Sequence, residues 1–462
     1  MGIVMIYKST PSLVCIGLMF ASPVWAETSS QGISDVSIHK SIHKSINNEF
    51  RNTNGEITNI LELLNISGQG ISLHEALSKT IKSNPKLRAY EYRIKAQQGR
   101  VLQSSFSKSP AINLSIEDAY GNGRFEGADA AQTTLSISWV IEGSARQRQI
   151  DLANIGKTAL TSESKINLLD VSAETAHRYL ISLANQARLA NAFKSLKLSK
   201  KMERVIKKRV QAGTTTKAEL ARAQVDVMRS KLELEDIVHE LKSSNRLLAA
   251  QWGNTTPKFS TVKGDVFSLP VIQSFETLKA QLEQSPTFTR LLSAKRLKQA
   301  ELKLAQAKGS FNWRVNLGVR HSEANKDQAL VAGVSIPFGG RSRNTGGIVE
   351  AQAKLSELNV KEGELRVGYE TSLFVLYQEM QHSFHQVDVY RNDIIPLLEK
   401  ALKETRRAYN LGRYSYLELR SVKTELLMAR NELVEASIDV HSKGIEIERL
   451  TGLRLAQQST KL

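Results

Sequence analysis

Two pairs of histidines have a spacing that could place imidazoles on one face of a helix. His39 and His43 lie four residues apart, and His382 and His385 lie three apart. A tetrahedral metal site needs three or four ligands, and neither pair brings a third. The lysines beside the first pair would also repel a cation. We therefore expect structural or incidental histidines, with no metal site and no cofactor.

Motifs for catalysis are missing as well. The sequence has no glycine-rich phosphate loop, no serine elbow and no paired metal-ligand motif. Its one cysteine, Cys15, lies in a segment that we expect to be removed, so no thiol nucleophile would remain. Carboxylates are scattered at helical surface spacing. The sequence predicts a protein without catalytic residues, and not an enzyme.

The first 26 residues have the features of a cleaved signal peptide. Lys8 supplies a positive charge, residues 13–21 form an apolar run, and Ala26 is the small residue expected at a cleavage site. The run is shorter than the roughly 20 apolar residues of a membrane-spanning helix, and no later run is longer. We expect an exported chain with no disulfide and no lipid anchor.

The chain is strongly basic. Its formal net charge is +17, and removal of the predicted signal takes away one lysine, which leaves +16. A basic excess often indicates nucleic acid or anionic lipid as a partner. An exported protein has little access to nucleic acid, and aromatic residues do not alternate with the basic ones. We therefore expect no nucleic-acid partner.

The chain contains one unit twice, at an offset of 199 residues. Gly213, Glu219, Leu220, Glu233, Leu234, Ser243 and Gly253 recur as Gly412, Glu418, Leu419, Glu432, Leu433, Ser442 and Gly452. Such self-similarity at a fixed period indicates a duplicated structural unit. The two halves are expected to share one fold.

Helices dominate each half. Apolar residues recur every three or four positions from Glu75 to Phe106 and from Phe275 to Lys308. Two longer helices are predicted from about Arg146 to Gln211 and from about Ile348 to Asn410. Roughly 65 helical residues would reach on the order of 100 Å, which suits a tunnel better than a globular core.

The helices after the two turns carry a regular apolar seam. Its members lie seven residues apart in each half: Leu220, Val227, Leu234, Leu241 and Leu248, then Leu419, Leu426, Leu433, Val440 and Ile447. One helix cannot bury its own apolar stripe, so the seam predicts partner helices. An ordinary soluble coiled coil would provide such partner helices equally well.

Four short strands are predicted by alternation of apolar and polar residues. The apolar members are Ile112, Leu114 and Ile116; Leu135, Ile137 and Trp139; Val315, Leu317 and Val319; and Leu330, Ala332, Val334 and Ile336. They form two hairpins, at 110–141 and 313–338. Each strand has one face for lipid and one for water, but four strands cannot close a barrel, so several chains would have to share one. Strands packed on helices in an ordinary sandwich are the alternative.

Aromatic residues stand at strand ends. Trp139, Trp313 and Phe338 lie where the aromatic girdle of a membrane barrel would meet lipid headgroups.

The duplicated order of helix, hairpin, long helix, turn and helix behind a signal peptide resembles the outer membrane efflux protein family, founded on the TolC channel. The resemblance covers about residues 70–455. Residues 117–136, with Glu117, Asp118 and Ala119 at their start, look like the branch that serves cobalt, zinc and cadmium efflux. Residues 335–341, Ser-Ile-Pro-Phe-Gly-Gly-Arg, follow the family pattern after a barrel strand. Val140 departs from it, since the family usually has proline there.

The resemblance implies a mainly α fold with a small β part. Duplicated helical hairpins would form an α-barrel tunnel, and each chain would give four strands to a trimeric 12-stranded β-barrel. The protein would be an outer-membrane subunit reaching into the periplasm, for passive exit of substrate, with heavy-metal cations favoured. Its partners would be two further copies of itself, outer-membrane lipid, a periplasmic adaptor (membrane fusion protein) and an inner-membrane RND pump.

The resemblance also assigns roles around the two turns. The adaptor would contact Ala212, Gly213, Thr214, Leu411, Gly412 and Arg413, and the periplasmic gate would include Tyr409 and Glu418. Ser421 stands at the family's next acidic position, so part of the acidic ring is missing. In the alternative interpretation the glycines are plain helix caps, and Glu418 is an acid favoured by the helix dipole.

The expected organisation follows these boundaries: signal peptide 1–26, polar extension 27–70, first repeat 71–254 with its turn at 213, linker 255–274, second repeat 275–453 with its turn at 412, and tail 454–462. Two other functions remain open at this point. One is a TolC-like channel for drugs or for type I secretion, and the other is a soluble periplasmic coiled-coil adaptor.

Overall fold

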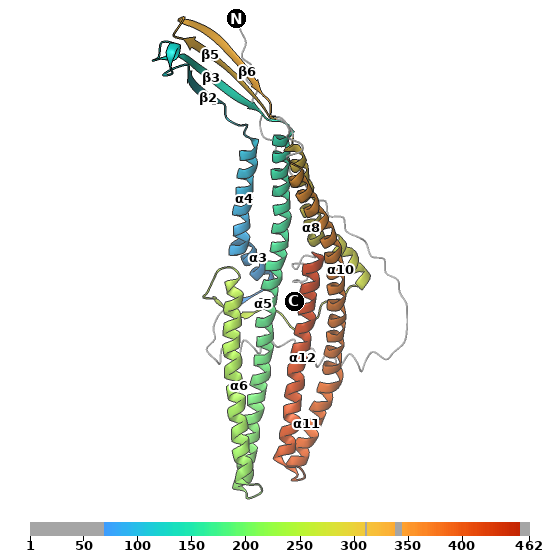
Figure 1. The fold of residues 1–462 in the computed structure, drawn as a ribbon. Coiled ribbons are helices and arrows are strands. Elements are labelled where there is room, and N and C mark those ends of the chain that lie inside the picture. Colours follow the sequence, from blue (N-terminus) through green and yellow to red (C-terminus); the bar gives the residue numbers. More distant parts are fainter. Residues whose placement is uncertain (1–68, 310–311, 338–343, 453–462) are drawn as a thin grey trace, which may run out of the picture. The chain divides into compact units, whose positions relative to one another are not determined.

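The computed structural model describes residues 69–309, 312–337 and 344–452. The expected signal peptide, nearly all of the polar extension, Phe338 and the C-terminal tail lie outside them. The described chain is mainly helical with a small β part, and helical hairpins occur twice (Figure 1). The predicted mainly α fold class, with a small β part and duplicated helical hairpins, is therefore confirmed.

Both halves have the same order of elements. The first consists of β1 (Gln69–Ile71), α3 (Leu73–Ser83), α4 (Pro85–Ser105), β2 (Ala111–Glu117), β3 (Gln132–Ile141), α5 (Ser144–Gln211) and α6 (Lys217–Ala250). The second consists of β4 (Phe259–Val262), α7 (Phe275–Glu283), α8 (Pro286–Ala307), β5 (Trp313–Ser322), β6 (Asp327–Ser335), α10 (Thr345–Val389), the π-helix η2 (Tyr390–Ile394), α11 (Ile395–Asn410) and α12 (Tyr416–Thr451).

The shorter helix of each half is broken, so the prediction of uninterrupted helices there was wrong. Asn84 separates α3 from α4, and its side chain accepts a hydrogen bond from the Lys86 N–H (2.9 Å). Pro85 follows as the first residue of α4, where its missing N–H costs nothing. Pro286 likewise begins α8, after Gln284 and Ser285, but the Ser285 side chain makes no capping hydrogen bond.

The second long helix changes form near its only proline. A π-helical turn lies between α10 and α11, and Pro396 stands directly after it, in the first turn of α11. Proline cannot donate the usual backbone bond, and a π turn is one way for a helix to absorb the loss. Arg391 in this turn donates to the Phe267 carbonyl at 3.0 Å and ties the helix to the linker.

A small parallel sheet, which the sequence did not predict, joins the two halves. β1 pairs with β4, 190 residues away along the chain. The Tyr179 hydroxyl of α5 donates to the Ile71 carbonyl at 3.1 Å, and Gln186 bonds the backbone of Val262 through both its amide atoms. The linker is thus a packed element.

Helix packing forms two hairpins. In the first helical hairpin α5 packs on α6, and in the second α12 packs on α10 and α11. The predicted seam lies inside these contacts, and eight of its ten members are buried: Leu234, Leu241, Leu248, Leu419, Leu426, Leu433, Val440 and Ile447. α5 also packs on α12, which joins the two hairpins.

Within the described residues no helix combines the length and apolarity that a membrane span requires.

Candidate functional site

The first helical hairpin reverses direction at a glycine. α5 ends at Gln211, and Gly213 has a φ of 71°. The Gly213 N–H donates to the Val210 carbonyl (3.1 Å), and the Thr214 N–H donates to the Arg209 carbonyl (2.9 Å). This pair of bonds is a Schellman motif, which needs a left-handed residue that glycine adopts without strain.

The second hairpin has the same turn. Gly412 has a φ of 76°, its N–H donates to the Tyr409 carbonyl (3.0 Å), and the Arg413 N–H donates to the Ala408 carbonyl (3.0 Å). All six residues predicted to contact an adaptor are exposed at these two tips. Both glycines are helix caps, and adaptor contact stays a prediction.

Glu418, predicted for the gate, lies in a capping box at the start of α12. Its carboxylate accepts hydrogen bonds from the Ser415 N–H (2.6 Å) and hydroxyl (3.0 Å), and its own N–H donates back to that hydroxyl (3.4 Å). The side chain is exposed. This geometry satisfies otherwise unpaired groups at the helix start, so Glu418 has a structural role whatever it does at the mouth.

Tyr409, the other predicted gate residue, is buried beside the first hairpin. The Arg209 guanidinium lies over its ring, 4.6 Å from the centroid, and donates to its carbonyl at 2.8 Å. Burial raises the pKa of Tyr409, and the charge of nearby Glu219 adds to the rise. Among the described residues the hydroxyl has no hydrogen-bond partner of acceptable geometry. A buried hydroxyl without a partner is costly and needs an explanation.

A polar cluster that the sequence did not reveal lies deeper between the hairpins. Asp226 of α6 accepts from the Tyr416 hydroxyl (2.6 Å) and pairs with Arg420 of α12 (3.1 Å). Lys423 donates to Ser199 of α5. Burial raises the pKa of Tyr416 and lowers that of Lys423. The sequence did contain one indication of this cluster, because a charged residue stands beside the apolar seam on each of two helices, Asp226 on α6 and Arg420 on α12.

Further polar links follow the contact between α5 and α12. They are Asp170 with Arg449 (3.0 Å), His177 with Glu446 (3.0 Å), Arg188 with Glu435, and Asn191 with Asn431 (3.2 Å). Hydrogen bonding to His177 is the largest cause that lowers the pKa of Glu446 to about 2. The two hairpins therefore meet through a ladder of polar pairs.

The four longer strands form one antiparallel sheet in the order β2-β3-β5-β6. Directly opposite residues share a face, and the register aligns two apolar rows across all four strands: Leu114, Leu135, Val319 and Leu330, then Ile112, Ile137, Leu317 and Ala332. Ile112 is 76% exposed and Leu330 is 90% exposed. The sheet has a large apolar face that no described residue covers.

The opposite face of the sheet is polar. Arg320 donates to Thr134 (3.1 Å) and to Gln132 (3.1 Å) and lies 3.5 Å from Glu117. Trp139 pairs with Val315 and Trp313 pairs with Ile141, which puts both tryptophans at one end of the apolar face. They are 38% and 49% exposed, respectively. The aromatic girdle stays a prediction, and Phe338 is outside the described residues.

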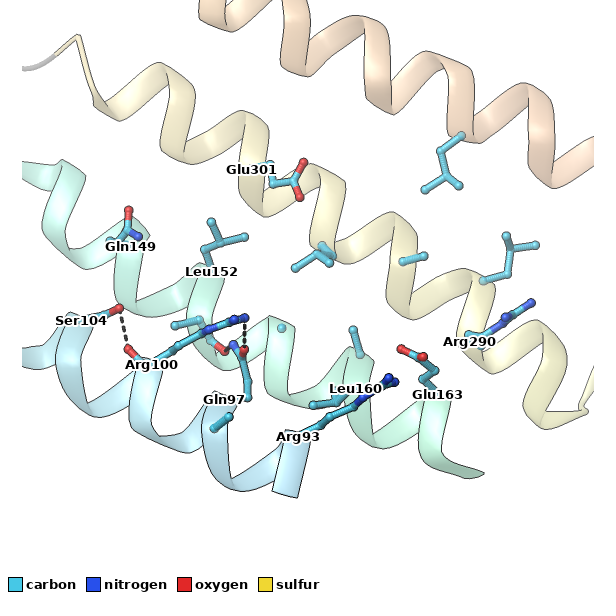
Figure 2. Close-up of a pocket in the computed structure, with 18 of the residues that line it drawn as sticks. Arg93, Gln97, Arg100, Ser104, Gln149, Leu152, Leu160, Glu163, Arg290 and Glu301 are labelled. Atoms are coloured by element: carbon cyan, nitrogen blue, oxygen red, sulfur yellow. Dashed lines mark hydrogen bonds between the residues drawn. The ribbon is translucent and has the colours of Figure 1, made fainter. Parts of the chain in front are cut away.

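A cavity of about 980 Å³ lies among α4, α5, α8 and α10 (Figure 2). Its lining combines apolar side chains with charged ones of both signs and includes Leu152, Leu160, Leu291, Leu297, Arg93, Arg100, Arg290, Glu163 and Glu301. Gln97 donates to the Ala153 carbonyl at 2.9 Å across it. Within the described part of the chain no three histidine, cysteine or carboxylate side chains are arranged to hold a metal ion.

Comparison with known proteins identifies similar sequences. The family model described as outer membrane efflux protein matches residues 76–254. The cobalt-zinc-cadmium resistance protein CzcC of Cupriavidus metallidurans is 23% identical over 383 residues, which is 83% of this chain and 90% of that protein.

Solved structures share the fold. CusC, whose structures were described in terms of folding and transmembrane channel formation, matches with a TM-score of 0.69 at 15% identity, over 83% of this chain and 92% of its own. The outer membrane protein VceC of Vibrio cholerae matches with a TM-score of 0.68 at 16% identity, over 82% of this chain and 96% of its own. The outer membrane channel CmeC of Campylobacter jejuni matches with a TM-score of 0.66 at 13% identity, over 84% of this chain and 89% of its own.

Proposed function

We propose that this chain is a channel protein of the outer membrane efflux protein family and not an enzyme. In this proposal it lets heavy-metal cations leave the cell. It would act as the passive exit duct of a tripartite system, with a periplasmic adaptor and an inner-membrane RND pump as partners. The alternative of a soluble coiled-coil adaptor does not fit this family.

The observation that carries the proposal is the one-sided apolar sheet. Its two apolar rows are exposed in the single chain, while the reverse face has an ion pair and hydroxyl groups. Water disfavours such an apolar surface, whereas hydrocarbon accepts it, and the polar face suits a wet lumen.

The edges of this sheet support assembly from several copies. Among the described residues β2 pairs only with β3, and β6 pairs only with β5. Unpaired backbone groups cannot remain in hydrocarbon, so the edges must pair with other copies. Three chains with four strands each would close a 12-stranded barrel, which is the homotrimer that we propose.

Support for metal cargo comes from the relative CzcC, whose name states cobalt, zinc and cadmium resistance and which aligns along most of both chains. The segment 117–136 noted in the sequence agrees with that assignment.

The two tips would form the periplasmic mouth, with Tyr409 inside it. Its buried hydroxyl lies near Arg209 and Glu219 but makes no hydrogen bond of acceptable geometry within the described chain, and a group of a neighbouring subunit would satisfy it in the closed trimer. The Tyr409→Phe variant should therefore conduct more than wild type in planar bilayers, while keeping its trimer.

Growth of a deletion strain tests the function. Wild-type chain should restore growth on zinc, cadmium, cobalt or copper, and a panel of drugs serves as comparison. Leu135→Asp puts a charge on the apolar face and should abolish trimer and resistance, whereas Ser136→Asp, one residue along on the polar face, should keep both. Rescue against drugs alone would keep the channel and exclude the metal assignment, and a detergent-independent monomer would exclude the channel.

A further inference from the structure

Positive charge is concentrated toward the tips of the two helical hairpins. The last 18 residues of α5, 194–211, contain eight lysines and arginines but only one acid, Glu203. α11, which ends at the other tip, has four basic residues and two acidic ones. Much of the excess charge of the chain is therefore close to the predicted mouth.

Part of this charge is repeated at equivalent positions of the duplicated chain. Lys201, Arg204 and Lys208 on α5 recur, 199 residues later, as Lys400, Lys403 and Arg407 on α11. The spacing of three and then four residues puts the members of each set on one helical face. All six side chains are exposed. We call the two sets the α5 stripe and the α11 stripe.

Some cations elsewhere in the structure are neutralised by ion pairs. Lys298 pairs with Glu301 at 2.8 Å, and Lys295 pairs with Glu362 at 3.0 Å. In the described chain none of the six stripe side chains forms an ion pair, and Arg204 donates only to the Lys200 carbonyl of its own helix (3.3 Å). Glu399, the acid beside Lys400, pairs with Arg430 instead. Like charges three and four residues apart destabilise a helix, so each stripe stays electrostatically unsatisfied.

We propose that the α5 stripe and the α11 stripe together form a docking surface for an acidic helical segment of a periplasmic protein. This inference rests on the proposed function, because it takes the partner to be the adaptor and names the chemistry of its contact. Carboxylates at matching helical spacing would neutralise the stripes and steer the encounter.

The position of the stripes favours a protein over lipid or cargo. Lys201 lies 57 residues beyond the start of α5, which follows directly after the sheet. That distance is on the order of 85 Å along the helix, far from a membrane that contains the sheet. Free metal cations would be repelled by six positive charges, so the stripes are not a cargo site.

A binding measurement with the detergent-solubilised full-length trimer tests the proposal. The probe is a fluorescein-labelled helical peptide with glutamates at positions i, i+3 and i+7. A peptide of the same composition in scrambled order and vesicles of phosphatidylglycerol are the comparisons. The variants are Lys201→Gln/Arg204→Gln/Lys208→Gln and Lys400→Gln/Lys403→Gln/Arg407→Gln. The matched control, Lys86→Gln/Lys242→Gln/Arg246→Gln, removes equal charge from exposed positions outside the stripes.

We expect each stripe variant to weaken binding of the patterned peptide by roughly tenfold, the two together to abolish it, and the control to change it by less than about twofold. Higher salt should weaken wild-type binding. Equal binding of the scrambled peptide, preferential binding of the vesicles, or unchanged binding in the double variant would each overturn the proposal. If the peptide-binding test contradicts the docking surface while the chain still confers metal resistance, the proposed function stands and only the docking surface is wrong.

Discussion

The contacts inside each helical hairpin differ in chemistry from the contact between the hairpins. Inside, α6 and α12 bury leucines and valines against their partner helices, and Leu248 and Val440 are completely buried. Between the hairpins, α5 meets α12 through an apolar cluster near the tips and, along the rest of the contact, through ion pairs and amides such as His177 with Glu446 and Asn191 with Asn431. Apolar burial dominates the first kind of contact, whereas specific polar bonds form a large part of the second.

The difference indicates which motion costs least. Opening an apolar seam exposes hydrocarbon surface to water, at about 25 cal/mol for each Å². Separating polar groups exchanges their bonds for bonds to water, so the net cost of each is only about 1 kcal/mol. The hairpins should therefore stay intact while they shift against each other, which is how a mouth built from their tips could widen.

Truncation of a seam leucine should give the largest loss of stability. Leu433 is 2% exposed in the seam of α12, and Leu433→Ala should lower the free energy of unfolding by about 2–5 kcal/mol because it leaves a cavity. Denaturant unfolding of the purified protein measures this. Leu417→Ala, on the same helix but 56% exposed, should change it by less than about 0.5 kcal/mol. Similar losses in both variants would remove the distinction between seam and surface.

Loss of the Asp226 carboxylate should act mainly on the contact between hairpins. Asp226→Asn leaves Arg420 without its ion pair and should cost about 1–3 kcal/mol. Its distinctive effect should be a higher open probability in planar bilayers, because Asp226 links α6 to α12 across the hairpins. Tyr416→Phe, which removes only one hydrogen bond to the same carboxylate, should shift both quantities less. A change in open probability in Leu433→Ala but not in Asp226→Asn would mean that the seams inside the hairpins, and not the contact between the hairpins, control opening.

Sequence predicted the apolar interfaces better than the polar ones. Leucines seven residues apart, such as Leu426 and Leu433, identify buried positions because burial follows helical period. Alternation in the strands likewise identifies the apolar face of the sheet. The bond between Asp226 and Arg420 was not predictable, since it joins residues 194 apart, and a charged residue beside a seam does not reveal which residue it pairs with. The pairing of β1 with β4 was missed for the same reason.

The breaks in the helices were a different kind of error. Pro85 and Pro286 follow residues that favour extended or capping conformations, so local sequence contained the signal. Helical periodicity on both sides concealed it. The role of Glu418 depends on its rotamer and on the neighbouring subunits, and periodicity carries no information on either.

Acid should weaken the polar interface selectively. The pKa of Glu446 falls from its ordinary 4.5 to about 2 in the folded chain, so its contribution is present above pH 4.5 and is lost as the pH falls toward 2. Because the side chain is 30% exposed, we expect about 1–2 kcal/mol, less than the full shift implies. Unfolding measured at pH 4.5 and pH 3, a window in which the Glu448 carboxyl described below changes stability little, should show this loss in wild type but not in Glu446→Gln.

Glu448 supplies the matched control, because its pKa moves the opposite way. Burial raises it to about 7, so the folded chain retains a proton that the unfolded chain releases, and stability declines as the pH rises from 4.5 to 7. Glu448→Gln should remove that decline and leave the acid loss unchanged. Loss of the acid effect in this variant instead would show that Glu446 is not its source.

Conversion of one polar link into an apolar one should have the smallest effect on stability and the clearest effect on gating. Asn191 donates to Asn431 at 3.2 Å, and Asn191→Leu/Asn431→Leu replaces both partners together. No polar group is left unpaired, so the free energy of unfolding should change by less than about 1 kcal/mol. The contact between hairpins would then resemble the seams, and the open probability in bilayers should fall. Asn191→Leu alone is the control, since it strands Asn431 and should lower stability by about 1 kcal/mol without closing the channel. An unchanged open probability in the double variant would mean that the polar character of this interface is not what lets the hairpins move.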